Sequence, residues 1–361
     1  MSKRLQIGVL NGDDIGHEIV PETVKVIKAA AARTGLDIEW KDLPIGRRAL
    51  DELGNTLPPD TLPTLQRLHG WILGPIGHQA YPKQPNAVNP HPILRKSFDL
   101  FANIRPSKSY RSIDSLHQNV DLIIVRENNE GFQPDRNVVA GSGEFRPSHD
   151  MTISVRVITR QGSSKVARAA FELARTRPRR KLTAVHKDTV YKLGCGMFAE
   201  ECRRIAAEYP DVTYGEAIVD TFAMRLVMKP QDYDVVVTTN MFGDILTDEA
   251  AGLVGGLGLA PGLSAGPVHA MAQATHGSAP DIAGRGIANP YAMIVSGQML
   301  VEWLGHKHDE PRAVAAAAMI GKAVEVVIEE RRAMTPDLGG SAKTVDMGNA
   351  IVAAIAEQAA A

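Results

Sequence analysis

The chain of 361 residues contains little cysteine and no long apolar run. Its two cysteines, Cys195 and Cys202, are seven positions apart, a spacing that fits neither a disulfide framework nor a metal site. We therefore expect both to be free thiols in a reducing cytoplasm. No segment reaches the roughly 20 apolar residues that a membrane helix needs, and the first apolar run turns polar too soon for a signal peptide. We expect a cytoplasmic protein with no membrane partner.

The chain also lacks a net charge that would indicate a polyanionic partner. Lys and Arg total 40 against 41 for Asp and Glu, so we expect no nucleic-acid partner. One basic cluster, RTRPRRK at residues 175–181, lies between a predicted helix and a predicted strand. We interpret it as a solvated helix end, with a phosphate-binding site as the alternative.

Two common nucleotide-binding motifs are missing as well. No GxGxxG follows the first predicted strand and no GxxxxGK[ST] occurs, so neither a Rossmann domain nor a P-loop is predicted. Instead, predicted strands at 5–10, 71–77 and 120–126 alternate with helices, and two helices are predicted near the end, at 291–304 and 311–332. This alternation indicates an α/β layered fold.

Two further segments bear on how the chain is arranged. Residues 151–160 (MTISVRVITR) alternate between apolar and polar side chains, which predicts a half-buried strand. The apolar face of this strand would consist of Ile153, Val155 and Val157. Residues 258–290 are rich in Gly, Ala, Pro and His and predict a long functional loop.

The motif GDILTD places Asp244 and Asp248 four positions apart. On a helix this spacing puts both carboxylates on one face, about one turn apart. Two like charges so placed repel each other, which favours a cation between them, and oxygen ligands suit Mg²⁺ or Mn²⁺. The alternative is that the two acidic residues only stabilise a helix N-terminus.

Three arginines are candidates for binding a carboxylate. Arg95, Arg105 and Arg126 occur in the segments LRKSFDLFANIRP and IIVRENNEG, and the planar guanidinium suits bidentate carboxylate recognition. Arg126 ends a strongly apolar predicted strand, where an arginine tends to face a cleft. The alternative for each arginine is an ordinary surface charge.

A glycine-rich segment near the C-terminal third is a candidate cofactor loop. HGSAPDIAGRGIANP, at 276–290, holds three glycines, two prolines and one acidic residue. Such a composition lets the backbone approach a ligand closely, which suits a nucleotide lying over the loop. Taken alone, a loop of this kind is not specific.

Taken together, NGDDIG, FANIRP, VHK, GDILTD and HGSAPDIAG resemble, in this order, the motifs of the β-decarboxylating dehydrogenases. That family includes isocitrate, isopropylmalate, homoisocitrate and tartrate/D-malate dehydrogenases, and the resemblance spans essentially the whole chain. It implies a two-lobed α/β fold with a large mixed sheet rather than a Rossmann domain. Residues 1–104 and 254–361 would form a large lobe with the cofactor loop. Residues 105–253 would form a small lobe with the metal site and the dimer interface.

The resemblance also implies a homodimer whose active sites are shared between subunits. By motif, Lys187 and Asp220 would come from the partner chain, and Asp220 would join Asp244 and Asp248 at the metal. Asp220 lies 24 positions before Asp244, as in the family motif. Lys187 would accept or relay the hydroxyl proton, and the cation would polarise the 2-hydroxyl group and then stabilise the enolate charge. Arg95, Arg105 and Arg126 would hold the β-carboxylate.

The resemblance further implies NAD as the cofactor. Asp281 and Ile282 occupy the positions at which, by the resemblance, NADP-dependent relatives have a lysine and a tyrosine. A carboxylate there accepts hydrogen bonds from the ribose 2′-OH and repels a 2′-phosphate. Asn289 would meet the adenine, with His276 beside it. The full predicted cofactor set is His276, Gly277, Ser278, Ala279, Asp281, Ile282 and Asn289.

Some positions depart from the family pattern. Gln133 stands where the family has its catalytic tyrosine, and glutamine cannot act as the acid that protonates the enol carbon; Tyr191 or a water could substitute. Thr189 replaces an asparagine, and GDDIGHE replaces GDGIGPE. These changes leave two alternatives to NAD-linked oxidation with decarboxylation. One is oxidation without completed decarboxylation, and the other is a non-catalytic regulatory paralogue in a hetero-oligomer.

The segment NPHPILR would contact the variable group of the substrate. By the resemblance, isopropylmalate enzymes have a pair of leucines at the positions of His91 and Pro92 in this chain. Asn89 makes the predicted pocket more polar still. We expect a (2R)-2-hydroxy diacid of the malate, isocitrate or isopropylmalate type, with isocitrate-like and malate/tartrate-like substituents both open. The alternative for His91 is packing at the start of a helix. Dimer and tetramer are both open.

Overall fold

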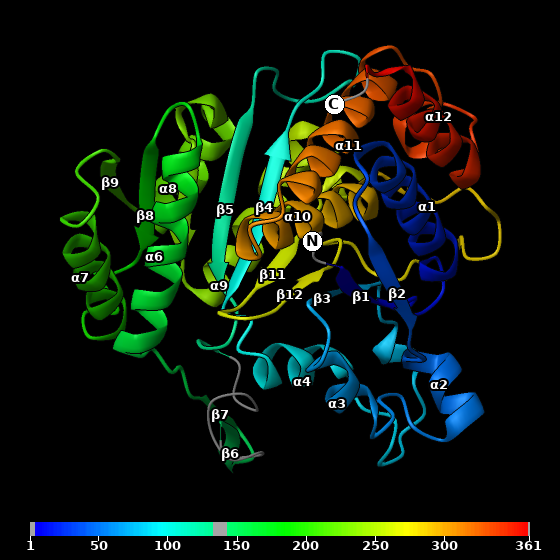
Figure 1. Cartoon of the computed structure of the whole chain (residues 1–361). Coiled ribbons are helices and arrows are strands. Elements are labelled where there is room, and N and C mark those ends of the chain that lie inside the picture. The colour runs from blue at the N-terminus through cyan, green and yellow to red at the C-terminus, as the bar shows by residue number, and fades with distance from the viewer. Residues whose placement is uncertain (1–3, 133–142, 360–361) are drawn as a thin grey trace. The chain divides into compact units, whose positions relative to one another are not determined.

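The computed structural model describes residues 4–132 and 143–359. The chain divides into two compact units, and ten strands of a mixed sheet are shared equally between them (Figure 1). The first unit consists of Met1–Phe98, Tyr110–Asp114 and Gly255–Ala361, and the second of Asp99–Ser109 and Ser115–Val254. The α/β class and the large mixed sheet predicted from the sequence are confirmed. No helix in the described ranges is both long enough and apolar enough to cross a membrane.

The first unit alternates strands with helices and ends in three long helices. Its strands are β1 (Leu5–Leu10), β2 (Ile38–Asp42), β3 (Gly70–Leu73), β11 (Leu263–Ala265) and β12 (Ala270–Ala272). Its α-helices are α1 (Gly16–Thr34), α2 (Gly46–Leu53), α3 (Thr61–Leu65), α4 (Pro90–Ser97), α10 (Tyr291–Lys307), α11 (Pro311–Glu329) and α12 (Thr344–Glu357). Short 3-10 helices are η1 (His78–Ala80), η3 (Leu257–Leu259) and η4 (Pro336–Leu338).

The strands of this unit run in the order β2-β1-β3-β12-β11. All neighbours are parallel except β11 and β12, which pair antiparallel. Both β1 and β3 are almost wholly buried, as expected for strands covered on both faces. The helices α1, α11 and α12 lie side by side in Figure 1 and pack against one another.

The prediction of one long loop over residues 258–290 is wrong in its first half. The hairpin strands β11 and β12 occupy part of it, and both are buried. Each strand has only three residues, which is too short for an alternating apolar pattern to be recognised. The glycine, alanine and proline content of the segment therefore favoured the prediction of a loop. Residues after β12 connect to α10 without regular structure.

The second unit has its own five sheet strands and a separate hairpin. Its sheet strands are β4 (Ala102–Lys108), β5 (Asp121–Glu127), β8 (Lys181–His186), β9 (Thr213–Ile218) and β10 (Val235–Thr238). The hairpin strands are β6 (Glu144–Ser148) and β7 (Met151–Ser154). Its helices are α6 (Arg160–Thr176), α7 (Gly194–Ala206), α8 (Val219–Met228), α9 (Asn240–Val254) and the 3-10 helix η2 (Pro230–Asp232).

The central strand β10 shows how this sheet is buried on both faces. Val235 and Val237 point into a core formed with α6 and α7, whereas Val236 points into a core formed with α8 and α9. Alternate side chains of a strand face opposite sides, so a continuous apolar run is what a strand between two helical layers requires. The order is β4-β5-β10-β8-β9, with only β4 and β5 antiparallel.

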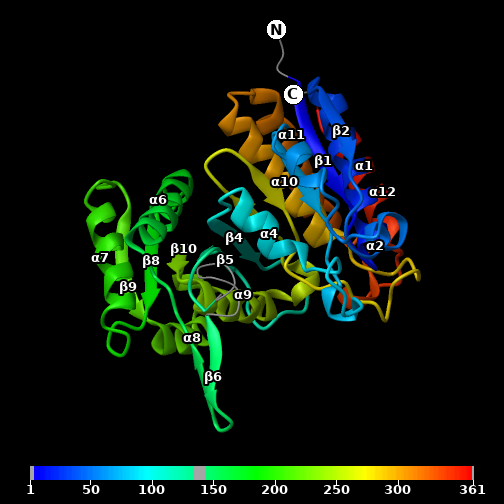
Figure 2. The same cartoon turned by 90° about the horizontal axis from the view of Figure 1, so that it is seen from below.

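The half-buried strand predicted over residues 151–160 is also wrong. Only Met151–Ser154 form a strand, all four residues are exposed, and β7 pairs solely with β6 in a hairpin that extends from its unit (Figure 2). Ile153 is 38% exposed. Alternation predicted the strand correctly at its start, but it cannot tell whether the apolar face meets this chain or another.

The basic cluster at 175–181 is more than a solvated helix end. Arg177 is bonded to the buried carboxylate of Asp234, and its Nη2 lies 3.0 Å from a carboxylate oxygen of Asp121. Arg179 donates to the Tyr233 carbonyl oxygen at 2.6 Å. These arginines therefore tie the end of α6 to the first residue of β5 and to the residues just before β10, and the solvated interpretation is wrong for Arg177.

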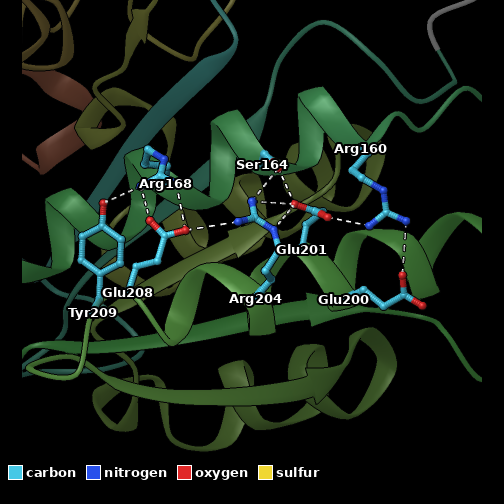
Figure 3. Close-up of polar contacts among 8 residues, drawn as sticks. All are labelled: Arg160, Ser164, Arg168, Glu200, Glu201, Arg204, Glu208 and Tyr209. Carbon is cyan, nitrogen blue, oxygen red and sulfur yellow. Dashed lines mark hydrogen bonds and ion pairs between the residues drawn. The ribbon is translucent and has the colours of Figure 1, made fainter.

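A series of hydrogen bonds and ion pairs links α6 to α7, and we call the residues that form it the α6/α7 network (Figure 3). It consists of Arg160, Ser164, Arg168, Glu200, Glu201, Arg204, Glu208 and Tyr209. At its centre Glu201, only 1% exposed, accepts hydrogen bonds from Arg160 at 2.6 Å, from Arg204 at 3.0 Å and from Ser164. Burial raises the pKa of Glu201, but these hydrogen bonds outweigh it and lower the pKa to about 2.

Candidate active site

Asp244 and Asp248 lie on α9 of the second unit, one turn apart, and we call them the acidic pair. Their side chains are 54% and 56% exposed. Partial burial raises the pKa of Asp248; Arg105 lowers it and the charge of Asp244 raises it again. Two oxygen-donor carboxylates are thus held together in a form that a hard cation would stabilise.

Arg105 on β4 and Arg126 on β5 reach the acidic pair from the neighbouring strands. Both are buried, at 8% and 3% exposure. The Nη1 atom of Arg105 lies 3.5 Å from Asp244 and 3.6 Å from Asp248, and Arg126 is bonded to Asp244. Burial lowers the pKa of Arg105, and the two carboxylates oppose this shift. The structure therefore brings together four of the predicted site residues from three elements.

Three polar residues that the sequence did not single out hold these arginines in place. Asn103 accepts from Arg105 Nε at 2.6 Å, Thr247 accepts from Arg105 Nη1 at 2.6 Å, and Asn240 accepts from Arg126 Nη2 at 2.8 Å. Asn240 and Thr247 lie four before and three after Asp244, on the same face of α9. That spacing was a signal in the sequence, but Asn103 offered none.

Gly243 allows Arg126 to cross α9. A Cβ atom at this position would lie 2.6 Å from Cγ of Arg126, closer than real Cβ atoms approach a neighbour. A glycine is required here because the arginine side chain passes directly over the helix backbone. The first residue of the GDILTD motif thus leaves room for Arg126 to reach Asp244, the second residue of the motif.

Lys187 and Asp220 form a separate pair in the same unit. Lys187 follows β8, Asp220 lies in the first turn of α8, and the lysine Nζ is bonded to the carboxylate. This hydrogen bond lowers the pKa of Asp220. Within the described part of the chain, no three His, Cys, Asp or Glu side chains are grouped closely enough to hold a metal ion. In a single chain, Asp220 therefore lies with Lys187 and apart from the acidic pair.

The predicted substrate residues of the first unit lie on α4. Asn89 is the helix N-cap, and its side-chain oxygen accepts the His91 N–H at 3.1 Å. His91 and Arg95 are four positions apart, so they share a face of α4. Both contact the side chain of Gln273, a residue that the sequence did not single out: Arg95 Nη2 lies 3.3 Å from Oε1, and His91 Nε2 meets Nε2.

The predicted cofactor loop is hydrogen-bonded to the N-cap and the first turn of α1 in the same unit. The Ser278 carbonyl accepts the Ile15 N–H at 3.2 Å, and Glu18 accepts the Gly284 N–H at 2.6 Å. Ala279 adopts a positive φ of 44°. Asp281 is exposed, so its carboxylate is accessible to a hydroxyl donor.

The two polar residues predicted to lie at the adenine, Asn289 and His276, already form hydrogen bonds within this chain. Asn289 donates to Asp337 at 2.9 Å and accepts the Tyr291 N–H at 2.9 Å. His276 Nδ1 lies 2.9 Å from the Gly277 carbonyl, and burial lowers the pKa of His276. Ile282 is half-buried and Gly277 exposed. The neutral imidazole suits an uncharged ring system better than a phosphate.

Gln133, the residue that replaces the family tyrosine, lies outside the described residues. Its neighbour Phe132 is among the described residues, and the guanidinium of Arg156 lies over its ring, 5.7 Å from the ring centroid. The same guanidinium lies 5.1 Å from the centroid of Tyr191 and 5.5 Å from that of Phe242. Tyr191, an alternative proton donor, is thus part of an aromatic cage around a cation.

Comparisons with known proteins decide the family. The family model described as isocitrate/isopropylmalate dehydrogenase matches residues 6–351. The chain is 40% identical to the isocitrate/homoisocitrate dehydrogenase of Thermus thermophilus over 350 residues, which is 97% of this chain and 98% of the relative. The chain belongs to the isocitrate/isopropylmalate dehydrogenase family. The predicted resemblance is therefore confirmed.

Other members of the isocitrate/isopropylmalate dehydrogenase family agree with this placement. The 3-isopropylmalate dehydrogenase of Archaeoglobus fulgidus is 39% identical over 350 residues, covering 96% of this chain and 98% of that one. The crystal structure of isocitrate dehydrogenase from Methylococcus capsulatus superposes with a TM-score of 0.85 at 40% identity, covering 97% and 99% of the two chains. The predicted fold is confirmed. These relatives carry the names of different hydroxy-acid substrates, although their sequence identities to this chain are nearly equal. Overall sequence similarity therefore does not indicate which substrate this chain uses.

Proposed function

We propose that the protein oxidises and decarboxylates a (2R)-2-hydroxy diacid of the malate, isocitrate or isopropylmalate type, using NAD and Mg²⁺ or Mn²⁺. The observation that carries the proposal is the acidic pair on α9 held against two buried arginines. The two carboxylates are only partly compensated by these arginines and stay half-exposed, so their oxygen atoms can also bind a cation, and a metal-chelating diacid needs both the cation and the arginines.

The residues present fit a divalent cation. Asp244 and Asp248 would hold it, and Asp220 of a second copy would complete the set of oxygen ligands. When bound, the cation would lower the pKa of the substrate hydroxyl and stabilise negative charge on its oxygen atoms. Arg105 and Arg126 are fixed by Asn103, Thr247 and Asn240 and would bind a substrate carboxylate in a defined orientation. The proposed substrate set also retains Arg95, Asn89 and His91.

Lys187 is proposed as the group that accepts or relays the hydroxyl proton, with Asp220 holding its Nζ in place. Shared sites require a homodimer, and exposed apolar side chains on the helices that carry Asp220 and the acidic pair support one. These side chains are Met224, Val227 and Met228 on α8, and Met241 and Ile245 on α9. Exposed apolar side chains on two helices in contact with each other are typical of a surface that a partner covers.

NAD rather than NADP is proposed because of the loop that contains Asp281 and Ile282. The loop is anchored to Ile15 and Glu18 and presents an exposed carboxylate. That carboxylate can accept hydrogen bonds from ribose hydroxyls and would repel a 2′-phosphate. When bound, NAD would accept the hydride from the hydroxyl-bearing carbon.

The test is NADH formation, followed at 340 nm, across a panel of 2-hydroxy diacids. The panel contains D-malate, the tartrates, isocitrate, homoisocitrate and 3-isopropylmalate, each with Mn²⁺ or with EDTA. Turnover of one member that EDTA abolishes is the expected result. Turnover that is equal in Mn²⁺ and EDTA would refute the metal assignment. Carbon dioxide released one-to-one with NADH would exclude oxidation without decarboxylation.

A second candidate is a non-catalytic paralogue in a hetero-oligomer, and Gln133 and Thr189 are the residues that favour it. The two candidates differ in cofactor binding and in turnover. If the panel is silent but NAD raises the melting temperature, the cofactor site is intact and the substrate lies outside the panel. If the panel is silent and NAD leaves the melting temperature unchanged, the non-catalytic candidate is supported.

A further inference from the structure

One amide side chain, that of Gln273, joins the two predicted substrate-binding residues of α4. Its Oε1 atom lies 3.3 Å from Arg95 Nη2, and its Nε2 atom contacts His91 Nε2. Gln273 stands 178 positions from Arg95 and 182 from His91 in the sequence. A residue this distant that bonds both members of a recognition pair is a candidate for positioning them.

The backbone around Gln273 places this amide firmly. Gln273 follows β12, and its N–H donates to the Gly262 carbonyl at 3.0 Å, which extends the pairing of β11 with β12 by one residue. On the other side, the Asn89 cap and Pro90 fix the start of α4. His91 and Arg95 therefore present one face of a short helix to one amide.

The direction of the hydrogen bonds follows from the donor and acceptor inventory. Arginine only donates, so the atom that faces Arg95 must be the amide oxygen. The amide NH₂ then faces His91 Nε2, and that nitrogen has to accept. An imidazole whose Nε2 accepts is neutral and carries its hydrogen on Nδ1.

We propose that Gln273 is a specificity-positioning residue that sets His91 as a neutral Nδ1–H donor toward a hydrogen-bond-accepting substituent on C3 of the substrate. The inference rests on the proposed function and sharpens its substrate class. It selects diacids whose C3 carries a carboxylate-bearing or hydroxyl group, such as isocitrate or tartrate, over those with an alkyl group. Through Arg95 the same amide supports binding of a carboxylate common to all members of the class.

The test compares kcat and KM of four proteins on two kinds of substrate. The proteins are the wild type, Gln273→Met, His91→Ala and the double variant, and methionine keeps the length of the side chain without its amide. The substrates are isocitrate or tartrate, whichever the wild type turns over, and 3-isopropylmalate. Gln298→Met, at a partly buried glutamine of α10 that donates to Glu302, is the matched control.

We expect Gln273→Met to reduce kcat/KM for the polar substrate about tenfold more than for the alkyl substrate, mainly through KM. His91→Ala should change the same ratio by a similar factor, and the double variant should change it no further, because both substitutions remove one interaction. Gln298→Met should leave the ratio unchanged. If Gln273→Met fails to fold, the ratio in His91→Ala still tests the donor role.

Equal losses on both substrates in Gln273→Met would overturn the proposal, since they would mean that the amide acts only through Arg95 or through the fold. Additive effects of the two substitutions on the ratio would overturn it as well. A wild type that turns over 3-isopropylmalate but neither isocitrate nor tartrate would also overturn the proposal, whereas a wild type that turns over no member of the panel would count against the proposed function, so the two failures are distinguishable.

Discussion

Two of the arginine–carboxylate clusters in the described part of the second unit differ in how completely their charges are paired. In the α6/α7 network, Glu201 is 1% exposed and accepts hydrogen bonds from Arg160, Ser164 and Arg204 (Figure 3). On α9, Asp248 is 56% exposed and lies 3.6 Å from Arg105. The carboxylate of Glu201 is thus fully hydrogen-bonded, whereas the carboxylate of Asp248 keeps oxygen atoms that are accessible to a further ligand.

The pKa directions express this difference in physical terms. Burial raises the pKa of Glu201, yet its three donors lower it to about 2, so the charged form is the favoured one. At Asp248, burial raises the pKa and the nearby arginines do not overcome that rise. A saturated carboxylate stabilises the fold, whereas an under-compensated pair reduces stability, and a cation such as the one we propose would relieve that cost.

The largest expected effect separates the two clusters by activity. Asp248→Asn removes one ligand charge, and we expect metal-dependent turnover to fall about a thousandfold, because a bound cation supplies several kcal/mol of transition-state stabilisation. The melting temperature without metal should be unchanged or slightly raised. Asp51→Asn, which loses only a surface ion pair with Arg47, is the control. Unchanged turnover in Asp248→Asn would refute the ligand assignment.

A complementation experiment tests whether the acidic pair is completed by a second copy. Lys187→Ala and Asp248→Asn should each be inactive, but coexpression should restore about a quarter of the wild-type activity. The reason is that half of the randomly formed dimers are mixed, and each mixed dimer has one site with both residues intact. Activity is measured on the purified mixture. No recovery, with mixed dimers present, would mean that both residues serve the site of their own chain.

Gly243→Ala tests the steric link between Arg126 and α9. The added Cβ would lie 2.6 Å from Cγ of Arg126 and would displace the guanidinium. We expect kcat/KM to fall about tenfold to a hundredfold, because small misplacements of a positioning group are costly. Gly252→Ala is a matched control on the same helix, since nothing lies within 4 Å of a Cβ there. Equal activity in both variants would contradict the steric role.

The α6/α7 network predicts the opposite outcome, a loss of stability with little loss of activity. Glu201→Gln leaves Arg160 and Arg204 without their buried carboxylate, and we expect the free energy of unfolding to fall by about 2 kcal/mol at pH 7. The pKa of Glu201 is lowered in the folded state, so the stabilisation is present above about pH 4.5 and is lost as the pH falls toward 2. Urea unfolding at several pH values measures this. A variant as stable as the wild type at pH 7 would contradict the assignment.

A second buried glutamate should give the reverse pH dependence. Burial raises the pKa of Glu127 to about 7, although the N–H groups of Asn129 and Glu130 lower it. Its contribution is therefore present below about pH 4.5 and is lost as the pH rises through 7. Glu127→Gln should remove this decline, so the variant gains up to about 3 kcal/mol relative to the wild type across that range. A constant difference between the two proteins would contradict it.

Much of the fold could be predicted because its signals are short-range. The apolar run at 120–126 predicted the buried strand β5, and the four-residue spacing of Asp244 and Asp248 predicted a shared helix face. The motif order predicted the family, which the comparisons confirm. The hairpin at Met151–Ser154 and the strands β11 and β12 were misjudged, since a few residues carry too little pattern to show what covers them.

The sequence by itself determined most of the elements, the family and the residue types available for chemistry, because these depend on neighbours a few positions apart. Only the tertiary structure decided which polar side chains meet. Gln273 reaches Arg95 across 178 positions, Arg126 reaches Asp244 across 118, and Arg160 reaches Glu201 across 41. No local pattern encodes such pairs, because they arise when strands and helices from distant parts of the chain pack together. That packing buried and saturated the carboxylate of Glu201 and left the carboxylate of Asp248 half-exposed.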